Sequence, residues 1–257
     1  MADKPERIIL LKVPIDIVSP EELPDVFSSL LPRNNPESSQ YGLDIVLLSL
    51  WDLLRARRKG EYQNYLLNAA LIIPISKSIV SGAKFLTGKT VYRHMPFKFV
   101  ISLLTFLEKQ DQSLFILGSK GMVLKKAEKN IRSTFPNLRI VGRYEGSIKK
   151  KEEAAVIEAI RKSSPSLLLA GKGIRGRELW IYRKSNQLNQ AIRLWCSDLL
   201  EVFAEKKRRP SDAVFEMGLE NIGHCWRNPL KILRIFSFLR FKWLLLYYWL
   251  RGKRNAV

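Results

Sequence analysis

Short apolar runs alternate with segments of helical period along most of this chain, and this alternation restricts the fold more than any other feature. Six runs have the length and composition of buried strands: 43–49, 69–75, 113–117, 138–141, 166–170 and 191–196. Helical segments separate them, at 51–68, 97–109, 123–135, 152–162 and 178–185. Such alternation indicates a parallel sheet with helices on both faces. We therefore predict an α/β, Rossmann-like, mostly parallel sheet.

The first residues precede this pattern. Residues 8–18 are typical of a strand or a hairpin, and Pro14 restricts that strand to an edge. A short helix is predicted over 20–31. We expect residues 1–204 to form the α/β domain and residues 205–257 to form a basic helical appendage.

Glycine ends three successive predicted strands, at Gly118, Gly142 and Gly171, and Gly146 and Gly173 follow in the same turns. Ligands of open parallel sheets bind beyond the carboxyl ends of the strands. Glycine there lets the backbone approach a phosphate closely. Three such turns in a row favour a nucleotide or nucleotide-sugar cleft, although ordinary turn glycines would give the same pattern.

The chain carries 44 Lys or Arg against 24 Asp or Glu, a formal net charge of +20 at pH 7. Hydrophobic residues make up 46% of it, which excludes a disordered polybasic tail. The charge therefore lies on a folded protein and predicts an anionic partner: nucleic acid, a phosphorylated substrate or an acidic membrane.

Residues 205–257 hold 12 Lys or Arg against 4 Asp or Glu, interleaved with aromatic side chains. The longest uncharged stretch there, 243–250, is too short to span a bilayer, which needs about 20 residues. The pattern favours an amphipathic basic helix, or two short ones, at a membrane surface. A packed C-terminal helix and a nucleic-acid stacking surface stay open. The candidate membrane-binding residues are Arg227, Lys231, Arg234, Arg240, Lys242, Trp243 and Trp249.

Cysteine and histidine are scarce. Cys196 and Cys225 build no disulfide framework, and His94 and His224 are too few and too scattered for a typical histidine-based metal site. The N-terminus has no apolar signal core, so we expect a reducing, cytoplasmic location.

Three motifs carry a resemblance to a known family: LGSKG at 117–121, VGRYEG at 141–146 and GKGIRGRELWI at 171–181. In this order and spacing they resemble the WecG/TagA/CpsF glycosyltransferases. KKRRP at 206–210 and the segment 217–234 are similar to the family's basic C-terminal appendage. The resemblance implies transfer of a hexosamine-type sugar from a UDP-sugar to a polyprenyl-diphosphate-linked acceptor in cell-surface polysaccharide synthesis. It also implies a peripheral position on the inner face of the plasma membrane, and it leaves a homo-oligomer open.

One departure from the family concerns catalysis. Where the family has P-D-G, with a proposed general base, this chain has Pro74, Ile75 and Ser76. A positioned base is worth roughly 10²–10⁴-fold in rate. The candidate replacements are Asp44, Asp52, Glu145, Glu178 and Asp198. Glu178 matches the family motif and follows a predicted strand end, so it is the expected catalytic carboxylate.

Three hypotheses follow: an active transferase that takes its base from elsewhere, a catalytically silent relative that binds nucleotide-sugar or lipid-diphosphate as a partner subunit, and a basic nucleic-acid-binding α/β protein. The last is the least favoured. Arginine binds phosphates bidentately and stabilises a leaving diphosphate without a metal, so we expect no metal and no cofactor besides the UDP-sugar substrate. The candidate substrate-binding residues are Gly118, Gly142, Arg143, Gly146, Gly171, Lys172, Gly173, Arg175 and Arg177.

Overall fold

The computed structural model describes residues 5–31, 43–188, 191–218 and 233–252. Strands β1 (Glu6–Leu10) and β2 (Val13–Ile17) pair antiparallel, which confirms the hairpin alternative for residues 8–18. Helix α1 (Leu23–Leu30) follows, where the sequence predicts a short helix.

A six-stranded parallel sheet forms the centre of the molecule, as predicted, with the strand order β4-β3-β8-β7-β5-β6. Its strands are β3 (Asp44–Leu48), β4 (Leu71–Pro74), β5 (Ser113–Leu117), β6 (Arg139–Tyr144), β7 (Leu167–Ala170) and β8 (Ile192–Trp195). The hairpin protects the β4 edge, because the backbone amide of Ile72 donates to Asp16 at 2.6 Å, and Arg7 is paired with the same carboxylate. β3 and β8 are joined by a buried ion pair between Asp44 and Arg193.

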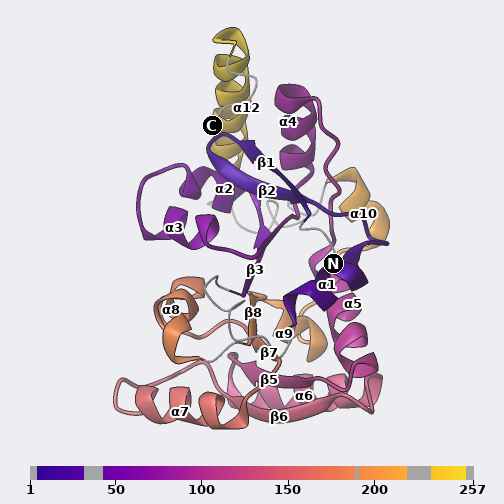
Figure 1. Cartoon of the computed structure of the whole chain (residues 1–257), viewed down its shortest axis with the longest axis vertical. Coiled ribbons are helices and arrows are strands. Elements are labelled where there is room, and N and C mark those ends of the chain that lie inside the picture. Colours follow the sequence, from indigo (N-terminus) through magenta and orange to yellow (C-terminus); the bar gives the residue numbers. More distant parts are fainter. Residues whose placement is uncertain (1–4, 32–42, 189–190, 219–232, 253–257) are drawn as a thin grey trace.

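Helices cover both faces of the sheet (Figure 1). They are α2 (Leu50–Ala56), α3 (Glu61–Leu67), α4 (Lys77–Thr87), α5 (Pro96–Lys109), α6 (Gly121–Thr134), α7 (Glu153–Ser163), α8 (Glu178–Arg183), α9 (Leu199–Phe203), α10 (Asp212–Met217) and α12 (Leu233–Leu250), with a 3-10 turn at Ser185–Gln187. One core cluster packs α1, α5, α6 and α9 against one face. Two others pack α2, α3, α4 and α12, and then α7 and α8, against the opposite face. Successive side chains of a strand point to opposite faces of the sheet, so alternate residues of each strand belong to the core clusters on the two faces.

Three details differ from the sequence prediction. The predicted helix over 51–68 is two helices, because Gly60, with φ +154°, interrupts it between α2 and α3. Helix α4 lies where no element was predicted. The fourth strand does not end at Gly142: β6 continues to Tyr144, and the missing Cβ of Gly142 makes room for the ring of Phe115 on the neighbouring strand.

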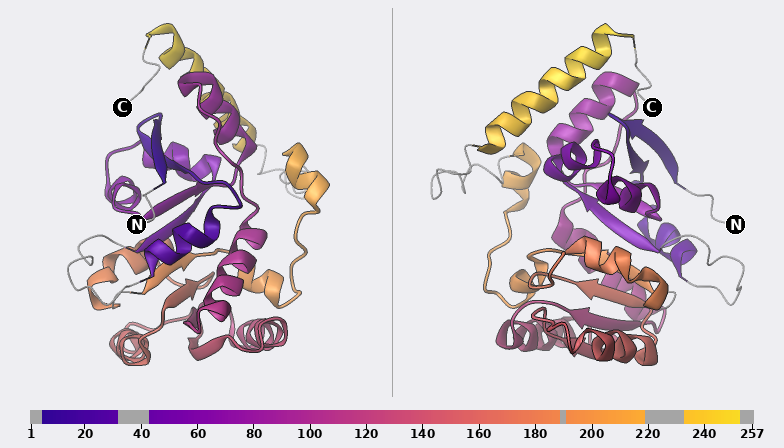
Figure 2. Two further views of the ribbon diagram at one scale, coloured as in Figure 1. Left: turned by 45° about the vertical axis from the view of Figure 1, so that its right-hand side comes forward. Right: turned by 90° about the vertical axis from the view of Figure 1, so that its left-hand side faces the viewer.

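Helix α12 packs against α4 and α2 at the end of the molecule opposite β6 and α7 (Figures 1 and 2). Phe241, Leu244, Leu245 and Tyr248 form its buried side. Gly82 of α4 permits this approach, since a Cβ there would lie 2.6 Å from the Phe241 ring. The described parts of the predicted appendage, α10 and α12, therefore both contact the α/β body. Arg227 and Lys231 lie outside the described residues, as does the side chain of Arg234.

Candidate functional site

The glycine turns that follow β5, β6 and β7 lie together at the carboxyl edge of the sheet. Backbone hydrogen bonds connect them: the amide of Ser119 donates to the Lys172 carbonyl at 2.5 Å, and the amide of Gly146 donates to the Ser119 carbonyl at 2.9 Å. A Cβ on Gly118 would lie 2.8 Å from the backbone of Gly171, and one on Gly146 would lie 2.6 Å from the Lys172 oxygen. The glycines thus allow backbone to pack on backbone. These two turn amides already have acceptors, so neither of them is free to bind a phosphate.

Gly142 and Arg143 lie inside β6 rather than in the turn beyond it. The guanidinium of Arg143 forms an ion pair with Glu128 of α6. Among the basic residues predicted for the site, Arg143 is therefore the one held by a helix on the face of the sheet. Its role in substrate binding stays a prediction.

Lys172 and Arg175 occupy the turn after β7 and have exposed side chains. Lys172 Nζ lies 2.7 Å from a carboxylate oxygen of Asp198, and Lys207 pairs with the same carboxylate. This contact raises the pKa of the Lys172 ammonium above its ordinary value. Burial tends to raise the pKa of Asp198, but the two lysine hydrogen bonds outweigh it and the pKa is lowered. Within the described residues, Arg175 has no recorded ion pair, so its charge is available to a ligand.

Glu178, the predicted catalytic carboxylate, is buried at the start of α8. Arg55 of α2 donates to its Oε1 at 2.8 Å, and Arg177 Nε lies 3.3 Å from its Oε2. Arg55 also places its guanidinium 4.0 Å from the centre of the Tyr62 ring. Glu178 therefore joins α8 to α2 across the carboxyl edge, with two cations next to it. Its catalytic role stays a prediction.

Asp52 stands in the first turn of α2, directly beyond the carboxyl end of β3. Its Oδ2 accepts a hydrogen bond of 2.5 Å from the Ser49 hydroxyl. Burial raises the pKa of the Asp52 carboxyl, the Ser49 hydrogen bond opposes that rise, and the negative charge of Glu178 adds to it. Asp52 and Glu178 therefore belong to one electrostatic cluster, although 126 positions in the sequence separate them.

The turn Pro74-Ile75-Ser76 lies beside this cluster. The Ser76 hydroxyl accepts from the backbone amide of Leu50 at 3.0 Å, which fixes the turn to the start of α2. Arg93 Nε donates to the Ile75 carbonyl at 2.9 Å. Neither Arg55 nor Arg93 was among the predicted site residues. Arg55 belongs to a basic cluster at 55–59 and Arg93 stands alone in the sequence, and neither pattern is specific for a site.

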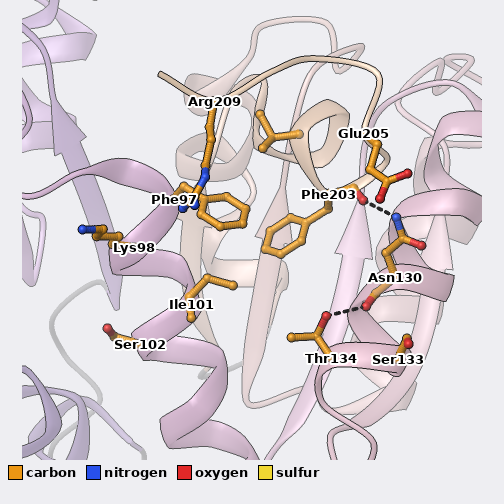
Figure 3. Close-up of a pocket in the computed structure, with 11 residues that line it drawn as sticks. Phe97, Lys98, Ile101, Ser102, Asn130, Ser133, Thr134, Phe203, Glu205 and Arg209 are labelled. Atoms are coloured by element: carbon orange, nitrogen blue, oxygen red, sulfur yellow. Dashed lines mark hydrogen bonds between the residues drawn. The ribbon is translucent and has the colours of Figure 1, made fainter. Parts of the chain in front are cut away.

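A groove of about 720 Å³ opens elsewhere, between α5, α6 and the segment after α9. Phe97 and Phe203 face each other there with ring centres 5.2 Å apart, and the Arg209 guanidinium lies 5.2 Å from the Phe97 ring (Figure 3). Asn130 on its wall donates to the Phe203 carbonyl at 2.7 Å. The lining holds one carboxylate, Glu205, which is ion-paired with Lys126. The lining of the groove thus lacks two neighbouring carboxylates like Asp52 and Glu178 at the carboxyl edge.

Helix α12 presents a second apolar side to solvent. Of its seven exposed large side chains in the described part, five recur at intervals of three and four residues: Phe236, Leu239, Trp243, Leu246 and Leu250. At about 100° per residue, these five fall on the side opposite the buried one. On the same wheel, Arg240 and Arg251 fall along one border of this stripe and Lys242 along the other. Among the described residues, no helix has the length and apolarity needed to cross a membrane.

In the described ranges, no three His, Cys, Asp or Glu side chains gather in a way that could hold a metal ion. Metal-independent chemistry stays a prediction.

The sequence matches a known protein family over nearly its whole length. The model of the glycosyl transferase WecG/TagA/CpsF family matches residues 8–255, nearly the whole chain. The chain belongs to this family. The resemblance predicted from the three glycine motifs is thereby confirmed, and with it the assignment to the glycosyl transferases.

Curated relatives of this WecG/TagA/CpsF protein carry the name N-acetylglucosaminyldiphosphoundecaprenol N-acetyl-beta-D-mannosaminyltransferase. The protein from Bacillus spizizenii strain W23 is 22% identical over 186 residues, which cover 72% of each chain. The protein from Bacillus subtilis strain 168 is 20% identical over 186 residues, which again cover 72% of each chain. The protein from Staphylococcus aureus strain NCTC 8325 is 24% identical over 182 residues, 69% of this chain and 71% of its own.

Proposed function

We propose that this WecG/TagA/CpsF protein transfers a hexosamine-type sugar from a UDP-sugar to a polyprenyl-diphosphate-linked acceptor in cell-surface polysaccharide synthesis. The observation that carries the proposal is the cluster at the carboxyl edge, where Asp52 and Glu178 lie beside Arg55 and Arg177. Carboxylates serve as proton acceptors, and arginines neutralise a leaving diphosphate. The names of the relatives support the same reaction class.

The donor diphosphate would lie over the turn after β7. Arg175 and Arg177 lie in this turn as exposed residues, and the exposed Lys172 adds a third cation. Arginine offers two parallel donors to phosphate oxygens and keeps its charge as the bond to the sugar breaks. These residues would therefore bind UDP-sugar and stabilise the UDP that departs.

Titration calorimetry with UDP-N-acetylhexosamines tests donor binding, and UDP release in the presence of a short polyprenyl-diphosphate-linked N-acetylglucosamine tests transfer. Arg175→Ala should weaken donor binding by at least tenfold, because it removes a charge with no recorded ion pair in the described fold. Arg161→Ala on the exposed side of α7 is the matched control and should bind like the parent. No binding by the parent protein would overturn the proposal, whereas binding without turnover would favour the silent-relative alternative.

We further propose that the chain docks peripherally on an anionic membrane through the exposed stripe of α12. An apolar stripe between two basic borders fits the boundary between acyl chains and acidic headgroups. The stripe includes Trp243, which is 62% exposed, while Trp249 is 43% exposed beside it. Arg240 and Lys242 are exposed at its borders. A lipid-linked acceptor would then be reached at the surface where it resides.

Co-sedimentation of the full chain with phosphatidylglycerol-containing vesicles tests the docking. A Trp243→Glu, Leu246→Glu double variant should lose more than tenfold in partitioning, because each buried apolar side chain contributes roughly 1.5–3 kcal/mol. Met122→Glu is the control, since Met122 is 87% exposed on α6, at a distance from this stripe in sequence and in element. Unchanged sedimentation of the double variant would contradict the assignment of α12.

A further inference from the structure

Two of the carboxylates at the carboxyl edge are neutralised by cations. Glu178 lies between Arg55 and Arg177. Asp198 lies between Lys172 and Lys207, and its pKa is lowered as a result. Asp198 is therefore a weak proton acceptor, because protonation would leave its two lysines without their counter-charge. Each oxygen of Glu178 lies beside an arginine.

Two other candidate catalytic carboxylates, Asp44 and Glu145, are less suitable because of their position or their exposure. Asp44 stands at the amino end of β3, at the other edge of the sheet, and is buried in its pair with Arg193. Glu145 is exposed in the turn after β6. Asp44 therefore lies a full strand length away from the glycine turns, and Glu145 follows the edge strand β6, on the far side of the sheet from β3 and Asp52.

Asp52 differs from all of these. Its recorded side-chain partner is a hydroxyl, that of Ser49, rather than a cation. It is partly exposed, and it stands beyond the end of β3, next to the neighbouring strand end that carries Ile75. The indole of Trp51, the preceding residue, is 59% exposed at the same edge and offers an apolar face on which a sugar ring can pack.

Resting on the transferase function proposed above, we propose that Asp52 is the catalytic base for the acceptor sugar. Its carboxylate takes the proton of the acceptor hydroxyl. The hydroxyl oxygen forms a bond to the anomeric carbon of the donor sugar, and the bond from that carbon to the diphosphate oxygen breaks. The electron pair of the broken bond leaves with UDP. Asp52 thus supplies the carboxylate that Ile75 does not provide.

The surroundings of Asp52 support this role. Glu178, which is 4% exposed, has one carboxylate oxygen, Oε2, with no hydrogen-bond donor in the described structure. A buried, under-satisfied acceptor is retained at a cost and is typical of a functional site. Arg177 beside it has φ +56°, a backbone conformation that non-glycine residues adopt rarely and often at functional sites.

Burial, and after it the negative charge of Glu178, raise the pKa of the Asp52 carboxyl, which strengthens it as a base. The charged and titratable groups that face it are Glu178 and Arg177 from α8, Arg55 from α2 and Tyr62 from α3. Turnover should therefore rise with pH as this one carboxyl loses its proton, and it should reach a plateau once Asp52 is fully ionised.

The test compares full-chain Asp52→Asn with the parent, measuring UDP release and donor binding. Asparagine keeps an oxygen that accepts from Ser49, so folding and UDP-sugar affinity should stay within about twofold. Turnover should fall by roughly 10²–10⁴-fold, the value of a positioned base, and the acidic limb of its pH profile should disappear. Asp52→Glu should recover part of the rate. Asp111→Asn, in an exposed turn at the opposite edge, should leave turnover unchanged.

The two proposals can fail separately. A parent protein that neither binds UDP-sugar nor releases UDP contradicts the transferase function itself, and the role of Asp52 with it. A parent that turns over while Asp52→Asn retains its rate within threefold, or retains the acidic limb, overturns the role of Asp52 alone. Loss of donor binding together with turnover in Asp52→Asn also overturns it, because the residue would then be structural.

Discussion

Replacing Arg193 by Met should destabilise the protein severely, because Arg193 neutralises a carboxylate in the centre of the sheet. Arg193 Nε donates to Asp44 Oδ1 at 2.8 Å, and Nη2 donates to Oδ2 at 3.1 Å. The two residues are 4% and 2% exposed. They are also register partners in the β3–β8 pairing, so the two side chains lie next to each other on one face of the sheet, where packing keeps both from water.

The expected cost follows from this geometry. Removing one member of a buried ion pair leaves an uncompensated charge and costs about 3–5 kcal/mol. The whole free energy of unfolding of a domain is about 5–15 kcal/mol, so the loss is a large fraction. Replacing both members by apolar side chains removes the stranded charge. The Asp44→Leu, Arg193→Met double variant should therefore recover at least half of the lost stability.

Urea unfolding followed by circular dichroism at pH 7 measures both variants. With a urea dependence of about 3 kcal/mol per M, Arg193→Met should lower the midpoint by about 1–1.7 M. Arg161→Met is the matched control, because Arg161 makes a similar two-bond pair with Glu158 on the exposed face of α7 and should cost less than about 1 kcal/mol. A midpoint shift below about 0.3 M for Arg193→Met, or a double variant no more stable than the single one, would refute the reasoning.

Three further predictions concern the remaining contacts. Gly82→Ala should cost about 1–3 kcal/mol, because its Cβ would displace the Phe241 ring, and adding Phe241→Leu should recover part of that loss in thermal unfolding. In a Cys225→Ser background, native Cys196 should react with iodoacetamide at pH 8 far more slowly than the unfolded chain, since burial raises the pKa of its thiol. Asp198, whose folded pKa is lowered, should stabilise the protein above its unfolded pKa and lose that contribution as pH falls through the folded value, so Asp198→Asn and the parent should converge in acid urea titrations.

Strands β4, β5 and β7 were predictable because each is a run of residues buried on both faces of the sheet. A strand covered by helices on both faces needs no polar alternation, so its length and the turn residues after it are visible in sequence. The run 113–117 coincides with β5, and the other predicted strands differ at their ends by a few residues. The prediction ended the fourth strand at Gly142, because glycine commonly marks the turn after a strand. In the structure β6 continues to Tyr144, and Gly142 makes room for the ring of Phe115. Helix α4 was missed because Gly82 stands near its centre and serine, threonine and β-branched residues make up about half of its sequence.

The sequence by itself determined the sheet, the three glycine turns and the family, since these depend on local pattern and on motif order. Only the tertiary structure decided which carboxylate has which neighbours. Glu178, Asp198, Asp44 and Asp52 are all acids near the ends of predicted strands, and the sequence distinguished Glu178 only by its match to a motif. In the fold, Glu178 lies between two arginines, Asp198 pairs with two lysines, and Asp44 pairs with the buried Arg193. Asp52 instead accepts a hydrogen bond from the Ser49 hydroxyl. The proton affinity of a carboxyl depends on charges within a few ångströms, and residues distant in sequence supply them.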